Sequence, residues 1–292
     1  MDFLGSDHRF RIEGSYWDIG GLTVTRGFGF EISGSFNRIH DCLAISNLEA
    51  GFLIRHPSID GAKQDWPSHN EVADCVSCLN EDASQQHADG FACKVASGIG
   101  NRFVRCTAWM NSDDGFDLFS KNRAIGAVRL EKCRSWLNGT AMRNGKLVKT
   151  RGNGNGFKLG GSGLPEDHES IGCEAVGNRG CGFTSNSNPH MRLISCRAEN
   201  NGENYTYYFT GPEAQPILVM ENCTECDDPT FDPTAWAHEH LALGKTSALL
   251  GESTDDRPGI LIMCSSLHGG GAERVACRLA CGLSKCFRVY ML

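Results

Sequence analysis

The sequence predicts an all-β solenoid, a parallel β-helix, because short apolar segments and turn signals recur along the chain without helical periodicity. Gly accounts for 35 of the 292 residues and Asn is abundant, which is typical of a chain with many tight turns. Few stretches repeat apolar residues at the spacing of an amphipathic helix. A leucine-rich repeat, the competing solenoid, is disfavoured because its leucine-rich consensus is missing.

The clearest repeat is a cysteine followed five residues later by an asparagine. It occurs at Cys42/Asn47, Cys75/Asn80, Cys106/Asn111, Cys133/Asn138, Cys173/Asn178 and Cys196/Asn201. The irregular intervals between these cysteines fit a solenoid whose coils carry loop insertions. We expect the cysteines to point inward at equivalent places, as a ladder of buried free thiols. Disulfide pairing is the alternative, and zinc is disfavoured because the C-x-x-C pairs Cys75/Cys78 and Cys223/Cys226 lack helpful His neighbours.

Gly-Phe pairs mark a second equivalent position in the coils. They are Gly29-Phe30, Gly51-Phe52, Gly90-Phe91, Gly115-Phe116, Gly156-Phe157 and Gly182-Phe183. If each Phe points inward, strand alternation sends the residue after it outward. Alignment on these pairs places Asp117 and Lys158 at one outward position in consecutive coils. It also places Asp89 beside Asp114, with Asp113 adjacent.

Four carboxylates therefore converge, from Asp89, Asp113, Asp114 and Asp117. Packed like charges repel one another, so a counter-ion is expected. Ligands that are all oxygen favour a hard cation, and Ca²⁺ accepts six to eight of them in flexible geometry. The sequence thus predicts a calcium site here, with a solvated acidic turn as the alternative, because Asp-Asp-Gly is ordinary turn chemistry.

Basic residues near this cluster are candidates for chemistry and for binding. Lys158 lies in GNGFKLGG, a glycine-rich setting where backbone can approach a ligand. Its alignment with the aspartates makes it a candidate functional residue, with a solvated surface lysine as the alternative. Lys94 and Arg55 share another outward position, the third after Phe, and are candidates for binding substrate anions. Plain surface charge is the alternative for both.

An insertion interrupts the coil before Phe157. Phe157 follows Cys133 by 24 residues, whereas Phe follows Cys by ten in the tightest coils, so about fourteen residues are inserted at roughly 139–152. Its basic residues are Arg143, Lys146, Lys149 and Arg151. We expect a loop on the catalytic side that helps to hold an acidic polymer, with Arg151 among the substrate-binding residues and solvated charge as the alternative.

Composition and local sequence argue against several other classes of protein. The net charge of −7 and the pI near 5.8 argue against binding to nucleic acid or to anionic membranes. No apolar run is long enough to span a bilayer. The first residues, MDFLGSDHRF, lack the basic start and apolar stretch of a signal peptide.

Three segments together resemble a known family. ADGFACK, GIGNRFVRCTAWMNSDDGFDLF and GNGFKLGG resemble the core of polysaccharide lyase family nine, calcium-dependent pectate lyases with a right-handed parallel β-helix. The resemblance extends from about Arg11 to about Asp228. It implies that Asp89, Asp113, Asp114 and Asp117 bind the catalytic Ca²⁺ and that Lys158 abstracts the proton.

The resemblance also implies a secreted enzyme that cleaves 4-linked polygalacturonate by β-elimination, and we expect it to act as a monomer. Because the repeat pattern begins almost at the first residue and dissolves after about Asp228, we expect a truncated member. Residues 1–228 are predicted to form the catalytic β-helix, and residues 229–292 a C-terminal region without a structural prediction. The alternatives are a polygalacturonase, an alginate lyase or uronate epimerase, and an inactive or carbohydrate-binding β-helix.

Overall fold

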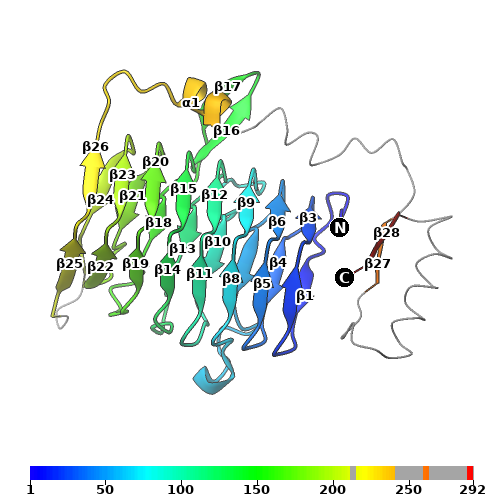
Figure 1. The fold of residues 1–292 in the computed structure, drawn as a ribbon. Coiled ribbons are helices and arrows are strands. Elements are labelled where there is room, and N and C mark those ends of the chain that lie inside the picture. Colours follow the sequence, from blue (N-terminus) through cyan, green and yellow to red (C-terminus); the bar gives the residue numbers. More distant parts are fainter. Residues whose placement is uncertain (211–214, 241–258, 263–287, 292) are drawn as a thin grey trace. The chain divides into compact units, whose positions relative to one another are not determined.

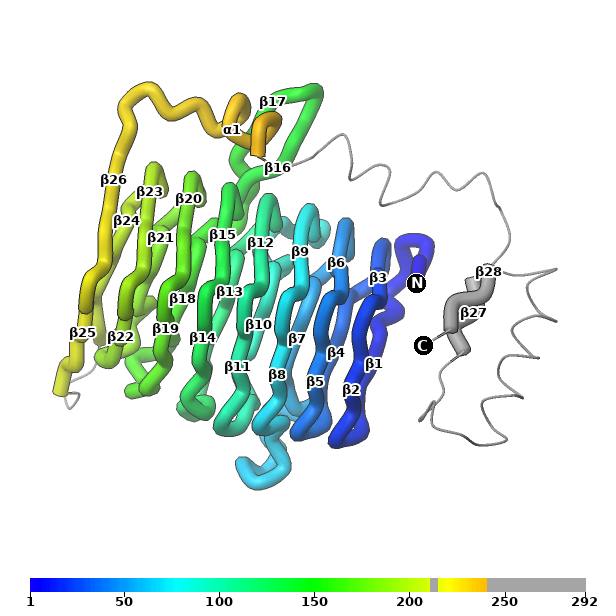
Figure 2. Tube along the Cα trace, viewed as in Figure 1, coloured from blue at the N-terminus to red at the C-terminus, as the bar shows by residue number. Residues whose placement is uncertain are grey.

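Strands of about three residues alternate with tight corners, and each third strand returns to the same sheet. The computed structural model describes residues 1–210, 215–240, 259–262 and 288–291. Within these residues the chain winds through three parallel sheets of eight strands each, so that every coil adds one strand to each sheet (Figure 1). The coils follow one another in sequence order along the stack, from blue to yellow in Figure 2. This is the predicted right-handed parallel β-helix.

We number the sheets in the order in which a coil visits them. Sheet I contains β1 (Phe10–Ile12), β4 (Phe30–Ile32), β7 (Phe52–Ile54), β10 (Phe91–Cys93), β13 (Phe116–Asp117), β18 (Phe157–Lys158), β21 (Cys181–Thr184) and β24 (Glu203–Thr206). Sheet II contains β2 (Asp18–Gly20), β5 (Arg38–His40), β8 (Glu71–Ala73), β11 (Arg102–Val104), β14 (Arg129–Glu131), β19 (Glu169–Ile171), β22 (His190–Ile194) and β25 (Ile217–Glu221). Sheet III contains β3 (Thr23–Thr25), β6 (Leu43–Ile45), β9 (Val76–Cys78), β12 (Thr107–Trp109), β15 (Arg134–Trp136), β20 (Glu174–Val176), β23 (Arg197–Glu199) and β26 (Thr224–Cys226).

The phenylalanines of the Gly-Phe pairs form a stack inside sheet I. The six rings are fully buried, and neighbouring rings lie 4.5–5.0 Å apart, nearly parallel. This distance follows from the strand spacing, because each ring lies directly above its equivalent in the next coil. Since Phe points inward, Asp117 on β13 and Lys158 on β18 pair in register on the outward side, as predicted.

The repeated cysteines lie at the corner between sheets II and III. Cys42, Cys75, Cys106, Cys133, Cys173 and Cys196 are each at most 2% exposed. Every cysteine in the described part of the chain is a free thiol, which confirms the predicted ladder and excludes disulfides among them. The residue before each ladder cysteine has positive φ, as at Arg105 (52°) and Lys132 (52°), and Gly172 supplies this conformation before Cys173.

The repeated asparagines form a hydrogen-bonded ladder at the corner between sheets III and I. Asn80 donates from its backbone N and its Nδ2 to Oδ1 of Asn111, and Asn111 does the same to Asn138. Asn138 continues to Asn178, and Asn178 to Asn201. Each side chain therefore accepts a hydrogen bond from a buried backbone N–H at the corner, where no strand pairing is available to satisfy it.

The insertion before β18 is an antiparallel hairpin rather than an irregular loop. Its strands are β16 (Thr140–Arg143) and β17 (Lys146–Lys149). Hydrogen bonds fix both ends: Arg143 pairs with Glu81, and the backbone N of Thr150 donates to Gly139 O at 3.0 Å. A cavity of about 630 Å³ lies between the hairpin and the corner that joins sheets III and I.

By its internal contacts the chain divides after Trp236. The remaining described elements are the 3₁₀ helix η1 (Lys63–Asp65), the helix α1 (Pro233–His240) and the parallel pair β27 (Gly259–Ile262) and β28 (Arg288–Met291). Most of the predicted region 229–292 lies outside the described residues. None of the helices in the described ranges is long and apolar enough to cross a membrane.

Candidate functional site

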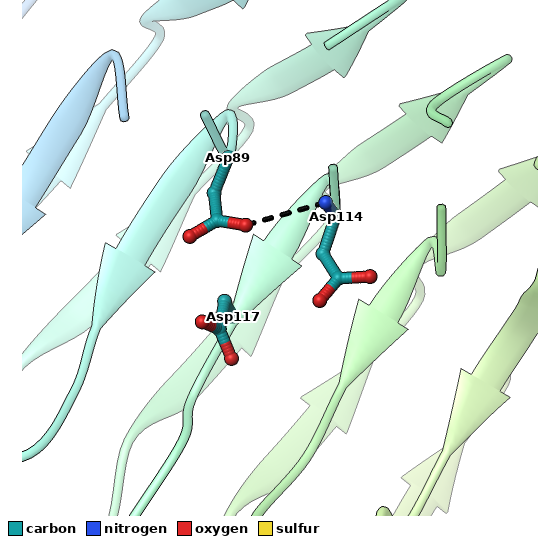
Figure 3. A group of neighbouring side chains, drawn as sticks. All are labelled: Asp89, Asp114 and Asp117. Atoms are coloured by element: carbon teal, nitrogen blue, oxygen red, sulfur yellow. Dashed lines mark hydrogen bonds between the residues drawn. The ribbon is translucent and has the colours of Figure 1, made fainter. Parts of the chain in front are cut away.

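Three carboxylates from two neighbouring coils meet on the outward side of sheet I. Asp89 ends the corner that leads into β10, Asp114 ends the same corner of the next coil, and Asp117 lies on β13 (Figure 3). One carboxylate oxygen from each lies within 4.8 Å of the others, and all three residues are at most 3% exposed. The backbone N of Asp114 donates to Asp89 Oδ1 at 3.2 Å and links the two coils.

Two lysines contact this cluster from different sides. Lys94 Nζ donates to Asp89 Oδ2 at 2.6 Å and to Asp117 Oδ2 at 2.8 Å. Lys158 Nζ donates to Asp114 Oδ2 at 3.0 Å and lies 3.4 Å from Asp117 Oδ1. Lys158 is itself buried and lies over the ring of Phe119, 5.3 Å from its centroid. The predicted base is thus next to the aspartates, and so is Lys94.

Asp113 lies beside the three-carboxylate cluster without belonging to it. Its Oδ1 accepts a hydrogen bond from the backbone N of Asn153 at 2.7 Å. Burial, reinforced by the charge of Asp114, raises the pKa of Asp113 to about 7. Asp113 is therefore electrostatically coupled to the cluster, although its carboxylate is held by the base of the hairpin.

The pKa values show how the charges compete. Burial raises the pKa of Asp89 well above its usual range, and Lys94 only partly opposes this effect. Burial also acts to raise the pKa of Asp117, but Lys158 and Lys94 outweigh it and lower that pKa to about 2. Burial disfavours the ammonium of Lys158, yet Asp114 and Asp117 outweigh burial and raise the pKa of Lys158.

The charge balance and the free acceptors suit a divalent cation. With all groups ionised, the four carboxylates carry two more charges than the two ammonium groups neutralise. Asp117 Oδ1 is buried, and its nearest cationic partner, Lys158 Nζ, lies at 3.4 Å without forming a well-aligned hydrogen bond. A metal ion could bind this weakly satisfied anionic oxygen. The all-oxygen donor set fits a hard cation.

Asn155 is part of the site although sequence reasoning assigned it no role. Its backbone N and its Nδ2 donate to Asp114 Oδ1 at 2.8 and 2.9 Å, which leaves Oδ2 of Asp114 to Lys158. The signal was present, because Asn155 occupies the position before Gly that Asp89 and Asp114 occupy in the preceding coils. Asn155 holds the Asp114 carboxylate in one orientation.

The other predicted binding residues, Arg55 and Arg151, form no ion pair with the aspartates in the described part of the chain. Arg55 follows β7, one coil before Lys94, and its Nη2 lies 3.7 Å from Glu31 Oε2. Arg151 follows β17 and is exposed near the base of the hairpin. Lys94 and Arg55 therefore have different surroundings, although the sequence alignment placed them at equivalent positions.

Residues 1–217 match the profile of a family described as a Pel9A-like, right-handed β-helix region. The chain belongs to this family. A solved structure, the crystal structure of pectate lyase Pel9A, superposes on this Pel9A-like chain with a TM-score of 0.52 at 28% identity. That match covers 70% of this chain and 55% of the other.

Two relatives of this Pel9A-like chain are also named as pectate lyases. Pectate lyase L of Thermoclostridium stercorarium is 38% identical over 209 residues, which are 70% of this chain and 17% of the relative. Pectate lyase L of Dickeya dadantii (strain 3937) is 35% identical over 270 residues, which are 87% of this chain and 60% of the relative. The chain thus spans less than two thirds of these relatives.

Proposed function

We propose that this chain is a pectate lyase that cleaves 4-linked polygalacturonate by calcium-assisted β-elimination. The observation that carries the proposal is the buried cluster of Asp89, Asp114 and Asp117 with the Nζ of Lys158 in contact with it, in a chain of the Pel9A-like family. Relatives named pectate lyase support the choice of substrate. By the same family reasoning, we propose that it acts outside the cell.

The three clustered aspartates and Asp113 are proposed to hold Ca²⁺. When bound, Ca²⁺ would offset the excess negative charge of these carboxylates and withdraw charge from the carboxylate of the substrate, which makes the C5 proton of the uronate more acidic and lowers the pKa of Lys158. The chain's own contribution is the fixed geometry. Asn155 orients Asp114, and Asn153 orients Asp113, so the oxygens need little rearrangement on binding.

Lys158 is proposed to take the C5 proton. The electron pair of the C5–H bond then forms the C4–C5 double bond, and the C4–O4 bond breaks. The leaving oxygen takes a proton from solvent. A base needs its neutral form, so loss of the carboxylate charge around Lys158 favours the amine over the ammonium. Burial works in the same direction, because it disfavours the charged form.

Lys94, Arg55 and Arg151 are proposed to bind carboxylates of the polymer. Lys94 is the nearest of the three to the cluster and competes with Lys158 for the role of base, since both ammonium groups contact Asp117. Lys158 is favoured because it is more deeply buried and lies in register with Asp117 on the adjacent strand.

One assay tests the proposal. Purified chain is incubated with polygalacturonate, and absorbance at the unsaturated-uronate band is followed with Ca²⁺ and again with chelator. Calcium-dependent absorbance is expected. Reducing ends that form without this absorbance would indicate a hydrolase, and a signal on alginate alone would indicate a different uronate substrate. Binding of the polymer without any cleavage would indicate a carbohydrate-binding β-helix that is not an enzyme.

A further inference from the structure

A second charged cluster lies on sheet I, on the N-terminal side of the aspartates. Its centre is Glu31 on β4, which is 6% exposed. Arg9 Nη1 donates a hydrogen bond to Glu31 Oε2. Arg11 Nε lies 3.5 Å from Glu31 Oε1, and Arg55 Nη2 lies 3.7 Å from Oε2. One carboxylate is therefore surrounded by three guanidinium groups, which we call the arginine cluster.

The arginine cluster has more positive charge than its own carboxylates neutralise. Arg9, Arg11 and Arg55 line a cavity of about 220 Å³ together with Glu31, Glu13 and Pro57. Guanidinium groups stay protonated at any working pH, so three positive charges face two carboxylates. An anion in the cavity would balance the remaining charge.

Two donors in this cluster lack acceptors. The Nε atoms of Arg9 and Arg55 are buried and have no hydrogen-bond partner among the described residues. Buried donors without acceptors are destabilising, so such a pair indicates a missing acceptor. Arg9 is also held in place, because its guanidinium stacks on the ring of Phe28 at 5.0 Å. A carboxylate, which accepts from guanidinium groups at two oxygens, fits this requirement.

The arginine cluster and the aspartate cluster lie in one row of sheet I. Strand pairing aligns Glu31 on β4 with Leu53 on β7, Ala92 on β10 and Asp117 on β13. Three strand steps separate Glu31 from Asp117, which is roughly 14 Å along the stack. Leu53 and Ala92 are buried and place no charge between the two clusters.

We propose that Arg9, Arg11 and Arg55 bind the carboxylate of a uronate unit several units away from the cleaved bond. A unit of a 4-linked pyranose chain is about as long as the step between coils, so a polymer can run along sheet I with its carboxylates meeting both clusters. The identity of the ligand as a polyuronate rests on the proposed function. The arginine cluster would then orient the polymer toward the N-terminal coils.

Direct binding tests this site separately from catalysis. Hexagalacturonate is titrated into the chain by calorimetry in the presence of chelator, so that calcium-dependent cleavage does not occur. The test variants are Arg11→Ala with Arg55→Ala, and Arg11→Gln alone, which leaves Arg9 and Arg55 to neutralise Glu31. The control is Arg102→Ala with Arg129→Ala, because these exposed arginines lie on sheet II and give the same change in net charge.

We expect the double variant at the arginine cluster to lose at least tenfold in affinity, Arg11→Gln to lose less, and the control to match the wild type. Binding of the wild type should also weaken as salt is added. Equal affinities in all variants, or no binding by the wild type, would overturn the inference. Arginine-dependent binding without calcium-dependent elimination would instead refute the proposed function and leave the site in place.

Discussion

At the scale of single residues, the central question is which of two lysines acts on the substrate. Lys94 bridges Asp89 and Asp117, whereas Lys158 contacts Asp114 and Asp117. Each amine is held as an ammonium group, because the carboxylates that it contacts raise its pKa above the usual range. Substitution distinguishes them, since only the base contributes to proton transfer.

Lys158→Ala is expected to lower kcat on polygalacturonate by about 10²–10⁴, the usual contribution of a general base. Lys158→Arg should be similarly damaging, because a guanidinium does not become neutral. Lys94→Ala should mainly raise KM. Initial rates from the absorbance assay measure all three variants, with circular dichroism as the folding control. An active Lys158→Ala beside an inactive Lys94→Ala would reverse the two assignments.

Asp114 should matter more than Asp113 for the metal. Asp114→Asn is expected to abolish measurable Ca²⁺ binding, because this carboxylate faces both Asp89 and Lys158. Asp113→Asn should weaken binding less, since Asp113 lies beside the three-carboxylate cluster. Calorimetric titration of Ca²⁺ gives the affinities, and Asp74→Asn, an exposed aspartate paired with Arg105, is the control for charge. If Asp113→Asn leaves the Kd unchanged, the ligand set is limited to the other three aspartates.

At the scale of elements, the hairpin β16–β17 precedes β18, the strand that carries Lys158, and contacts the corner of an earlier coil. Arg143, counted among the basic residues of the insertion, is paired with Glu81 and helps to attach the hairpin. Lys146 and Lys149 are exposed. Among the four basic residues of the insertion, Lys146, Lys149 and Arg151 form no ion pair with the described part of the chain, whereas Arg143 helps to attach the hairpin.

Excision of residues 140–149 is expected to raise KM for polygalacturonate several-fold without unfolding the coils. The excision is feasible because Gly139 and Thr150 are hydrogen-bonded neighbours, so a pair of glycines can join them. Steady-state rates on polygalacturonate measure the effect. Lys146→Ala with Lys149→Ala, which keeps the hairpin, separates charge from shape. An unchanged KM after excision would mean that the hairpin's basic residues are solvated charge.

At the scale of the whole molecule, the asparagine ladder couples successive coils. Asn111→Ala removes the acceptor for the backbone N and the Nδ2 of Asn80. It also removes one of the two donors to Asn138 Oδ1, the Nδ2 of Asn111, while the backbone N of residue 111 still donates. We expect a loss of about 3 kcal/mol in the free energy of unfolding, since each buried group left unpaired costs about 1–3 kcal/mol. Urea unfolding measures it. Asn201→Ala, in the partly buried C-terminal part of the ladder, is the matched control and should lower the free energy of unfolding less. Equal losses would argue against a ladder that couples coils.

Much of this architecture was predictable because a solenoid repeats the same local requirements in every coil. The cysteine and asparagine positions recur where corners need a buried thiol and a hydrogen-bonding side chain, and the phenylalanines recur where sheet I faces the core. Alignment of these repeats placed Asp117 opposite Lys158 and Asp89 beside Asp114, which the strand register confirms. Because equivalent residues recur in every coil, the register between neighbouring strands can be predicted without information about distant contacts.

The sequence by itself determined the coil, its register and the face on which the aspartates gather, since all three follow from residues that recur at equivalent positions. Only the tertiary structure decided the pairing of side chains that do not recur. It placed Lys94 within the aspartate cluster and Arg55 beside Glu31, folded the insertion into a hairpin, and brought Arg9 and Arg11 to the same carboxylate. The physical reason is that long charged side chains span more than one strand step, so their partners depend on packing in three dimensions.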